Sequence, residues 1–144
     1  MDVMIRTLEE KDFNQLPSLL GDLGYPSSKE DVETRFKKIM GNRLYHTFVA
    51  ELNGEITGLL GMHMEYSYVN NQPAARVIAM VVKAEHRNQG IGKGLMQKAE
   101  QTAREKGAYM MVLNSGNRDE RQAAHRFYER TGFQGKATGF YKYL

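Results

Sequence analysis

The sequence predicts an α+β (mixed α/β) fold, with a central, mostly antiparallel mixed sheet of six to seven strands flanked by about four helices. The hydrophobic period changes along the chain from helical to alternating and back. A hairpin signal, Asn53-Gly54, joins two strand-like runs, because both residues tolerate the positive φ of a tight turn. The resulting order is β-α-α-β-β-β-α-β-α-β. Its early antiparallel hairpin distinguishes it from a doubly wound fold.

The first half of the chain is expected to hold two helices between strands. Ser28 is a good cap for the second helix, and Asp31 is a loose capping-box partner. Gly21 and the turn at 24–26 are expected to end the first. The most strand-like run, at 76–83, is expected near the sheet centre. The expected elements are a strand at 3–7, helices at 9–20 and 28–40, and strands at 44–52, 55–69 and 76–83.

The second half is expected to alternate between helix and strand. A helix at 90–106 has a buried stripe of Ile91, Leu95, Ala99 and Ala103, and Gly107 ends it. The remaining expected elements are a strand at 109–113, a helix at 120–130 stopped by Gly132, and one or two closing strands within 133–144.

The bulk composition is that of a globular protein with one domain, spanning 1–144. Hydrophobic residues make up 41% and charged residues 26%. There is no cysteine, which excludes disulfides and a cysteine nucleophile. No apolar run approaches the ~20 residues of a membrane helix, and the N-terminal residues do not resemble a signal peptide, so we expect a cytoplasmic protein without membrane contact. The net charge of +3 is small and dispersed, so we expect no nucleic-acid partner.

The chemistry is expected in the loop from Arg87 to Gly94, which joins the buried strand to the helix at 90–106. Its glycines, Gly90, Gly92 and Gly94, let the backbone approach a ligand without a Cβ in the way. The free N–H groups and the dipole of the helix start favour an anion. Arg87 and Lys93 add positive charge, so a pyrophosphate is the natural ligand.

Two well-known phosphate motifs do not fit this loop. A P-loop requires glycine where Arg87 stands and Ser or Thr where Gly94 stands. A Rossmann fingerprint requires glycine where Leu95 stands.

A third motif fits. Arg-x-x-Gly-x-Gly is met by Arg87, Gly90 and Gly92, and with the preceding strand it resembles the acyl-CoA signature of the GNAT superfamily of N-acetyltransferases. The segment 124–133, Ala-His-Arg-Phe-Tyr-Glu-Arg-Thr-Gly-Phe, is similar to that family's second signature. The resemblance implies a GNAT-like fold, acetyl-CoA as co-substrate, and transfer of its acetyl group to a primary amine of a small molecule by direct attack in a ternary complex.

The resemblance also implies which residues bind the co-substrate. Backbone amides of the glycine loop would hold the pyrophosphate, and the backbone of the central strand would carry the pantetheine arm. Many members have Asn where this chain has Arg121; Asn114 or Asn117 could replace it, or Arg121 could reach a phosphate. The residues assigned in this way are Met80, Val81, Val82, Arg87, Asn88, Gln89, Gly90, Ile91, Gly92, Lys93, Gly94, Asn114 and Arg121.

Two catalytic roles follow from the same resemblance. Tyr128 is expected to be the general acid that stabilises the leaving thiolate; the alternative is a tyrosine that only packs in the core. The attacking amine needs a base, commonly a carboxylate acting through water. Glu65 is the first candidate and His63 the second, against the alternative that this glutamate merely faces solvent.

The acceptor is less clear from the sequence. Residues 58–65 and 119–128 have a weaker resemblance to the aminoalkylphosphonate acetyltransferase branch, which implies a small acceptor. The alternatives are acetylation of a protein N-terminus or lysine, a CoA-binding regulator that needs no Tyr128, and a nucleic-acid binder using the basic residues of the last helix. The four histidines are too dispersed to predict a metal site. An aromatic run at 140–144 suggests a homodimer.

Overall fold

The computed structural model describes residues 2–115 and 122–144. It divides into two compact units, Met1–Val112 and Leu113–Leu144. Among the described residues, no helix is both long and apolar enough to cross a membrane.

A single sheet organises the chain. Its order is β1-β2-β3-β4-β5, and β1 to β4 pair antiparallel, each strand with the next. Asn53 and Gly54 have φ of 50° and 82°, which confirms the predicted tight turn between β2 and β3. The strands are β1 (Met4–Thr7), β2 (Tyr45–Leu52), β3 (Glu55–Glu65), β4 (Ala74–Val82) and β5 (Met110–Leu113).

The prediction of six to seven strands was too high, because the described residues form five. Residues 133–144 contain none of the expected closing strands. A strand requires a ladder of backbone bonds, and the apolar residues here come in adjacent pairs rather than in alternation. Phe140 and Tyr143 are 92% and 94% exposed. The homodimer, which was inferred partly from this run, stays a prediction.

β3 also ends earlier than predicted, at Glu65 rather than at residue 69. In the following loop, the Ser67 hydroxyl accepts the N–H of Val69, and the Asn70 side chain accepts the N–H of Gln72. Such local bonds offer the backbone an alternative to the strand ladder.

The helices follow the predicted order. The Ser28 hydroxyl accepts the N–H of Asp31 at 3.1 Å, which confirms the predicted cap. The first helix begins as a 3₁₀ segment, η1 (Glu10–Gln15), and continues past Gly21, because the left-handed residue that ends it is Gly24, with φ of 104°. The α-helices are α1 (Leu16–Leu23), α2 (Lys29–Met40), α3 (Ile91–Glu105) and α4 (Gln122–Arg130), and a short 3₁₀ segment, η2 (Ala84–His86), follows β4.

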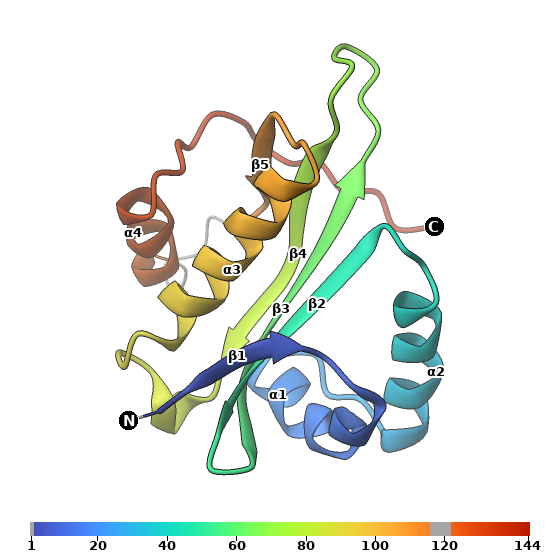
Figure 1. Cartoon of the computed structure of the whole chain (residues 1–144), viewed down its shortest axis with the longest axis vertical. Coiled ribbons are helices and arrows are strands. Elements are labelled where there is room, and N and C mark those ends of the chain that lie inside the picture. Colours follow the sequence, from blue (N-terminus) through green and yellow to red (C-terminus); the bar gives the residue numbers. More distant parts are fainter. Residues whose placement is uncertain (1, 116–121) are drawn as a thin grey trace. The chain divides into compact units, whose positions relative to one another are not determined.

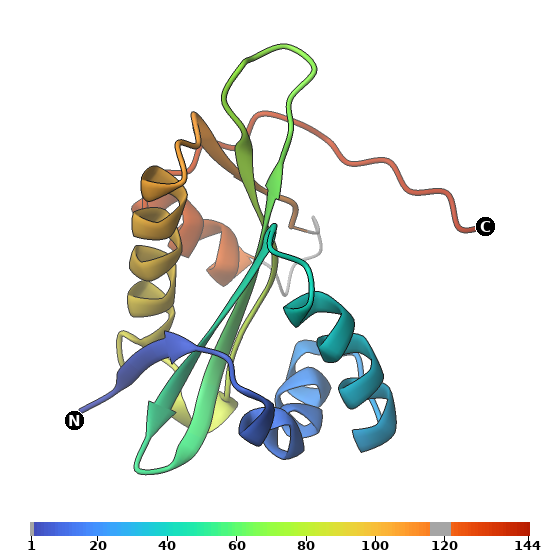
Figure 2. The same cartoon turned by 45° about the vertical axis from the view of Figure 1, so that its right-hand side comes forward.

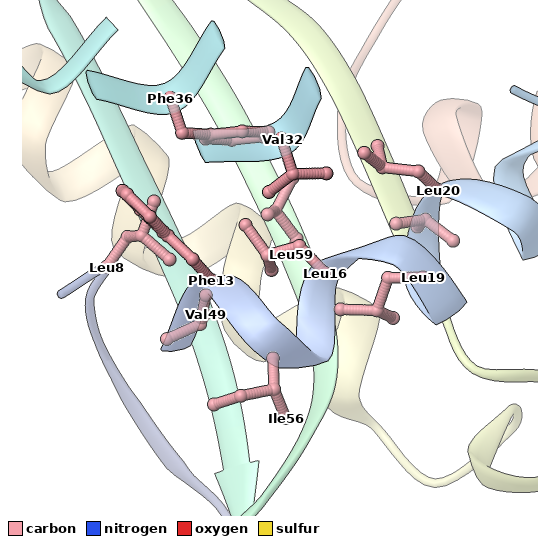
Figure 3. Close-up of a cluster of buried hydrophobic side chains, with 11 residues drawn as sticks. Leu8, Phe13, Leu16, Leu19, Leu20, Val32, Phe36, Val49, Ile56 and Leu59 are labelled. Carbon is pink, nitrogen blue, oxygen red and sulfur yellow. The ribbon is translucent and has the colours of Figure 1, made fainter. Parts of the chain in front are cut away.

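Within the first unit, helices cover both faces of the sheet. α1 and α2 lie on one face and α3 on the other (Figures 1 and 2). The core beneath α1 and α2 combines residues of η1 and both helices with residues of β2, β3 and β4 (Figure 3). Its members are Leu8, Phe13, Leu16, Leu19, Leu20, Val32, Phe36, Val49, Ile56, Leu59 and Val81.

Two β-bulges interrupt the ladders that β3 forms with its neighbours. The register places Ala50 opposite Gly58 but Glu51 opposite Ile56, which leaves Thr57 as the extra residue of β3. It places Gly61 opposite Ala79 but Met62 opposite Val77, which leaves Ile78 as the extra residue of β4. Bulges bend a strand and are common beside functional sites.

A partly buried ion cluster ties η1 to the sheet. Arg6 donates to both carboxylate oxygens of Asp12 at 2.8 Å and to Glu51 at 2.7 Å. The Asp12 carboxylate, which is 3% exposed, also accepts the N–H of Glu9. Burial alone would raise the pKa of Asp12, but the bonds from Arg6 and from the Glu9 backbone outweigh it and lower that pKa.

Asp12→Asn is expected to reduce the free energy of unfolding at neutral pH by roughly 1.5–3 kcal/mol, the usual range for a hydrogen bond to a charged group. Because the pKa of Asp12 is lowered in the folded state, its contribution is full above the unfolded value of about 3.9 and is lost as pH falls through the folded value. The gap between parent and variant should therefore close in acid. Urea unfolding at neutral and acidic pH measures it, with the exposed Asp2→Asn as control; a gap independent of pH would contradict this account.

Candidate active site

The predicted loop has the backbone of an anion-binding turn. Asn88 and Gly90 both have positive φ, 63° and 82°. The first bond inside α3 is donated by Gly94 to the carbonyl of Gly90 at 3.0 Å. The amides of Ile91, Gly92 and Lys93 therefore have no acceptor within the helix, as is general for a helix start. They are available to a ligand at the positive end of the helix dipole.

The loop is open and positively charged. Residues 87 to 90 are exposed, and so is Lys93. A Cβ on Gly90 would meet no atom within 4 Å, so glycine is required here for its left-handed backbone rather than for space. These features fit a pyrophosphate, as the sequence predicts.

Gly58, which the sequence reasoning missed, lies under the start of α3. A Cβ at this position would come within 3.0 Å of a methyl of Leu95 and 3.1 Å of one of Ile91. The helix thus packs directly against the backbone of β3, and this contact fixes the height of its N-terminus above the sheet. A glycine inside a strand is the only signal that could have indicated this close approach.

The end of β4 leads into the loop. Met80, Val81 and Val82 pair with Leu60, Leu59 and Gly58, and one residue separates them from the bulge at Ile78. Val81 is buried in the core, and the other two are partly buried. The Nε of Arg87 donates to the carbonyl of Val82 at 3.2 Å, which folds the first residue of the loop back onto the strand end.

Tyr128 lies in the second unit, in α4. The C-terminal end of this helix orients the Tyr128 ring. Gly132 has φ of 98°, and its N–H bonds to the carbonyl of Glu129, while the N–H of Phe133 bonds to the carbonyl of Tyr128. This is a Schellman motif, which brings the residue after the glycine onto the last turn. The rings of Phe133 and Phe127 meet the Tyr128 ring edge-on, with centroids at 6.1 and 5.7 Å. The Gly-Phe of the second signature therefore holds the tyrosine in place.

The two candidate bases share one sheet face. Glu65 and His63 are two residues apart on β3, on the face of Leu59. The carboxylate of Glu65 pairs with the Nε of Arg76 on β4 at 3.1 Å, and the ring of His63 lies 4.5 Å from that of Tyr45. Both side chains are partly buried.

Two further assigned positions follow β5 in the sequence. Asn114 is exposed just after β5. Arg121 and its possible substitute Asn117 lie outside the described residues.

Comparison with known proteins gives a consistent result. The model of the acetyltransferase (GNAT) family matches residues 5–133. An aminoalkylphosphonate N-acetyltransferase of Salmonella typhimurium is 33% identical over 99 residues, which cover 69% of this chain and 63% of that protein; the chain thus spans less than two thirds of that relative. A glucosamine 6-phosphate N-acetyltransferase of Trypanosoma brucei brucei is 28% identical, over a match that covers 93% of this chain and 90% of that protein. The crystal structure of a GNAT family acetyltransferase from Staphylococcus aureus matches all of both chains with a TM-score of 0.86 and 32% identity.

Proposed function

Since the chain belongs to the GNAT family and is an N-acetyltransferase, we propose that it moves the acetyl group of acetyl-CoA to a primary amine of a small molecule, by direct attack in a ternary complex. The observation that carries the proposal is the loop from Arg87 to Gly94, where left-handed residues lead into a helix start with free amides. We further propose that residues 1–144 form one acetyltransferase domain. The family match across both units supports this.

The chain's residues would divide the binding of acetyl-CoA between them. The amides of Ile91, Gly92 and Lys93 would bind the pyrophosphate, with the side chains of Arg87 and Lys93 adding charge. The backbone of β4 from Met80 to Val82 would accompany the pantetheine arm. Asn88, Gln89 and Gly94 complete the loop, and Asn114 and Arg121 stay candidates.

The ammonium of the acceptor must lose two protons to become an amide nitrogen, and the departing sulfur must gain one. Glu65, through a water, would take a proton from the ammonium of the acceptor, so that the amine nitrogen can attack the thioester carbon. The carbon–sulfur bond then breaks, and the Tyr128 hydroxyl would give its proton to the departing sulfur. The attacking nitrogen still carries one surplus proton, which it would lose as the amide forms, and the Tyr128 phenolate would take up a proton to restore the hydroxyl.

The acceptor is proposed to be a small primary amine that carries a phosphonate or phosphate group. The two curated relatives act, by their names, on an aminoalkylphosphonate and on glucosamine 6-phosphate, which share this combination. The alternatives are a protein N-terminus or lysine as acceptor, and a CoA-binding regulator without catalysis.

A thiol-release assay with acetyl-CoA and a panel of amines tests this proposal. The panel contains an aminoalkylphosphonate, glucosamine 6-phosphate, their analogues without phosphorus, and a lysine peptide. We expect release that depends on the amine and is fastest with the phosphorus-containing members. Faster release with the peptide would favour a protein acceptor, and no release with any amine would favour the regulator.

Glu65→Gln tests whether Glu65 acts as the general base or only faces solvent. The variant keeps an oxygen for the bond to Arg76 but cannot accept the proton. If Glu65 is the base, turnover should fall at neutral pH and recover in alkaline solution, where the free amine is already abundant. The control is Glu100→Gln, which removes the same charge from an exposed pair on α3. A pH profile of the Glu65 variant that parallels the parent's would exclude Glu65 and leave His63 as the next candidate.

A further inference from the structure

An ion cluster connects the turn between β2 and β3 to the start of the cofactor loop. One carboxylate oxygen of Glu55 accepts a hydrogen bond from the ammonium of Lys83 at 2.9 Å, and the other lies 3.4 Å from Nε2 of His86. The side chains of Lys83 and His86 are 17% and 18% exposed, so both are largely enclosed. The hydrogen bond between the two groups lowers the pKa of the Glu55 carboxyl and raises the pKa of the Lys83 ammonium. Both groups are therefore charged at neutral pH.

The two residues that Glu55 contacts lie at the two ends of η2. The N–H of His86 bonds to the carbonyl of Lys83 at 2.9 Å, and Arg87 follows directly. Lys83 is the last residue before η2, and His86 is the last residue before the loop. A side chain that holds both therefore determines where the loop begins.

Glu55 itself lies on a well-fixed strand start. The side chain of Gln15 donates to the carbonyl of Gly54 and accepts the N–H of Ile56, which attaches the turn to η1. The carbonyl of the bulged Thr57 accepts the N–H of Lys83 at 2.8 Å. Gly58 lies under the first turn of α3. The first four residues of β3 therefore contact both the residues that precede the loop and the helix that follows it.

We propose that Glu55 is a positioning residue for the cofactor loop: it holds Lys83 and His86 so that the loop amides face the pyrophosphate of acetyl-CoA. The inference rests on the proposed function. Preorganised donors bind a ligand more tightly than donors that must first be ordered, so fixing the start of the loop matters for binding.

Two other roles explain the cluster less well. A carboxylate oxygen of Glu85 also lies near those of Glu55 and the His86 ring, as in a metal site, but the Lys83 ammonium occupies this cluster and repels a cation. As a stabilising salt bridge, a partly exposed pair contributes little. The positioning role differs from both because it predicts an effect on the position of the loop.

The test compares Glu55→Gln with Glu100→Gln by acetyl-CoA calorimetry, and by hydrogen exchange of amides 84–90 in the protein without acetyl-CoA. We expect Glu55→Gln to weaken acetyl-CoA binding roughly tenfold, to accelerate exchange in this segment, and to leave the melting temperature and saturated turnover nearly unchanged. The control should match the parent in all four. The direction of the change in acetyl-CoA affinity is informative. Glu55→Gln removes a negative charge beside an anion site, and the charge effect alone would strengthen binding.

Lys83→Met removes the other partner of the ion pair and provides a second test. If the pair acts as a unit, the double variant should bind acetyl-CoA no more weakly than the worse single variant. Unchanged or tighter binding, or unchanged exchange, in Glu55→Gln would overturn the positioning role while the parent still binds acetyl-CoA. A parent that does not bind acetyl-CoA would instead refute the proposed function itself, and the positioning role with it.

Discussion

Tyr128→Phe should lower turnover by about 10²–10⁴-fold, the usual contribution of a positioned proton donor. The variant should remain folded and bind acetyl-CoA almost as the parent does. The substitution removes only the hydroxyl, and the ring contacts with Phe127 and Phe133 do not depend on it. The Schellman motif that places Phe133 is made by backbone groups, so it too is preserved.

The comparison requires turnover, acetyl-CoA affinity and melting temperature for the same preparations. Tyr143→Phe, which removes the hydroxyl of a tyrosine that is 94% exposed, is the matched control. A tyrosine that only packs would keep its activity and show at most a slightly lower melting temperature. If turnover falls less than about threefold while chemistry limits the rate, the proton must come from water or from the acceptor.

Gly92→Val should weaken acetyl-CoA binding by about 100-fold or more. A branched side chain on the second residue of α3 would stand where the pyrophosphate meets the helix amides, and each hydrogen bond to a charged group is worth roughly 1.5–3 kcal/mol. Calorimetry measures the loss. Gln97→Val places the same side chain on an exposed position of the same helix, so it reports the cost of valine to the helix alone. A Gly92 variant that binds as well as the parent would contradict the anion-binding role of the loop.

Local sequence signals predicted the elements that position the loop. The Ser28 cap, the Asn53-Gly54 turn and the apolar stripe of α3 are each encoded by a few neighbouring residues, and all three are present as predicted. Glycine was harder to interpret, because Gly21 lies inside α1 and Gly24 ends it. Only the backbone conformation, which the sequence does not specify directly, separates the two.

Long-range features were not predictable in the same way. Glu55 and Lys83 are far apart in the sequence, and only the antiparallel pairing of β3 with β4, which ends at Gly58 and Val82, brings them together. The fit of Gly58 beneath Ile91 and Leu95 also depends on tertiary packing. The closing strands expected in 133–144 are absent from that segment, because a strand requires a paired neighbour in addition to a suitable sequence.

Acetyl transfer to a small primary amine can be observed directly by following an isotopically labelled acetyl group. The protein is incubated with acetyl-CoA labelled in its acetyl group and with an aminoalkylphosphonate or glucosamine 6-phosphate, and the products are identified by mass spectrometry. We expect the label on the amine nitrogen, with one acetyl transferred for each thiol released. Recovery of the label as free acetate, or its retention on CoA with every amine tested, would contradict it.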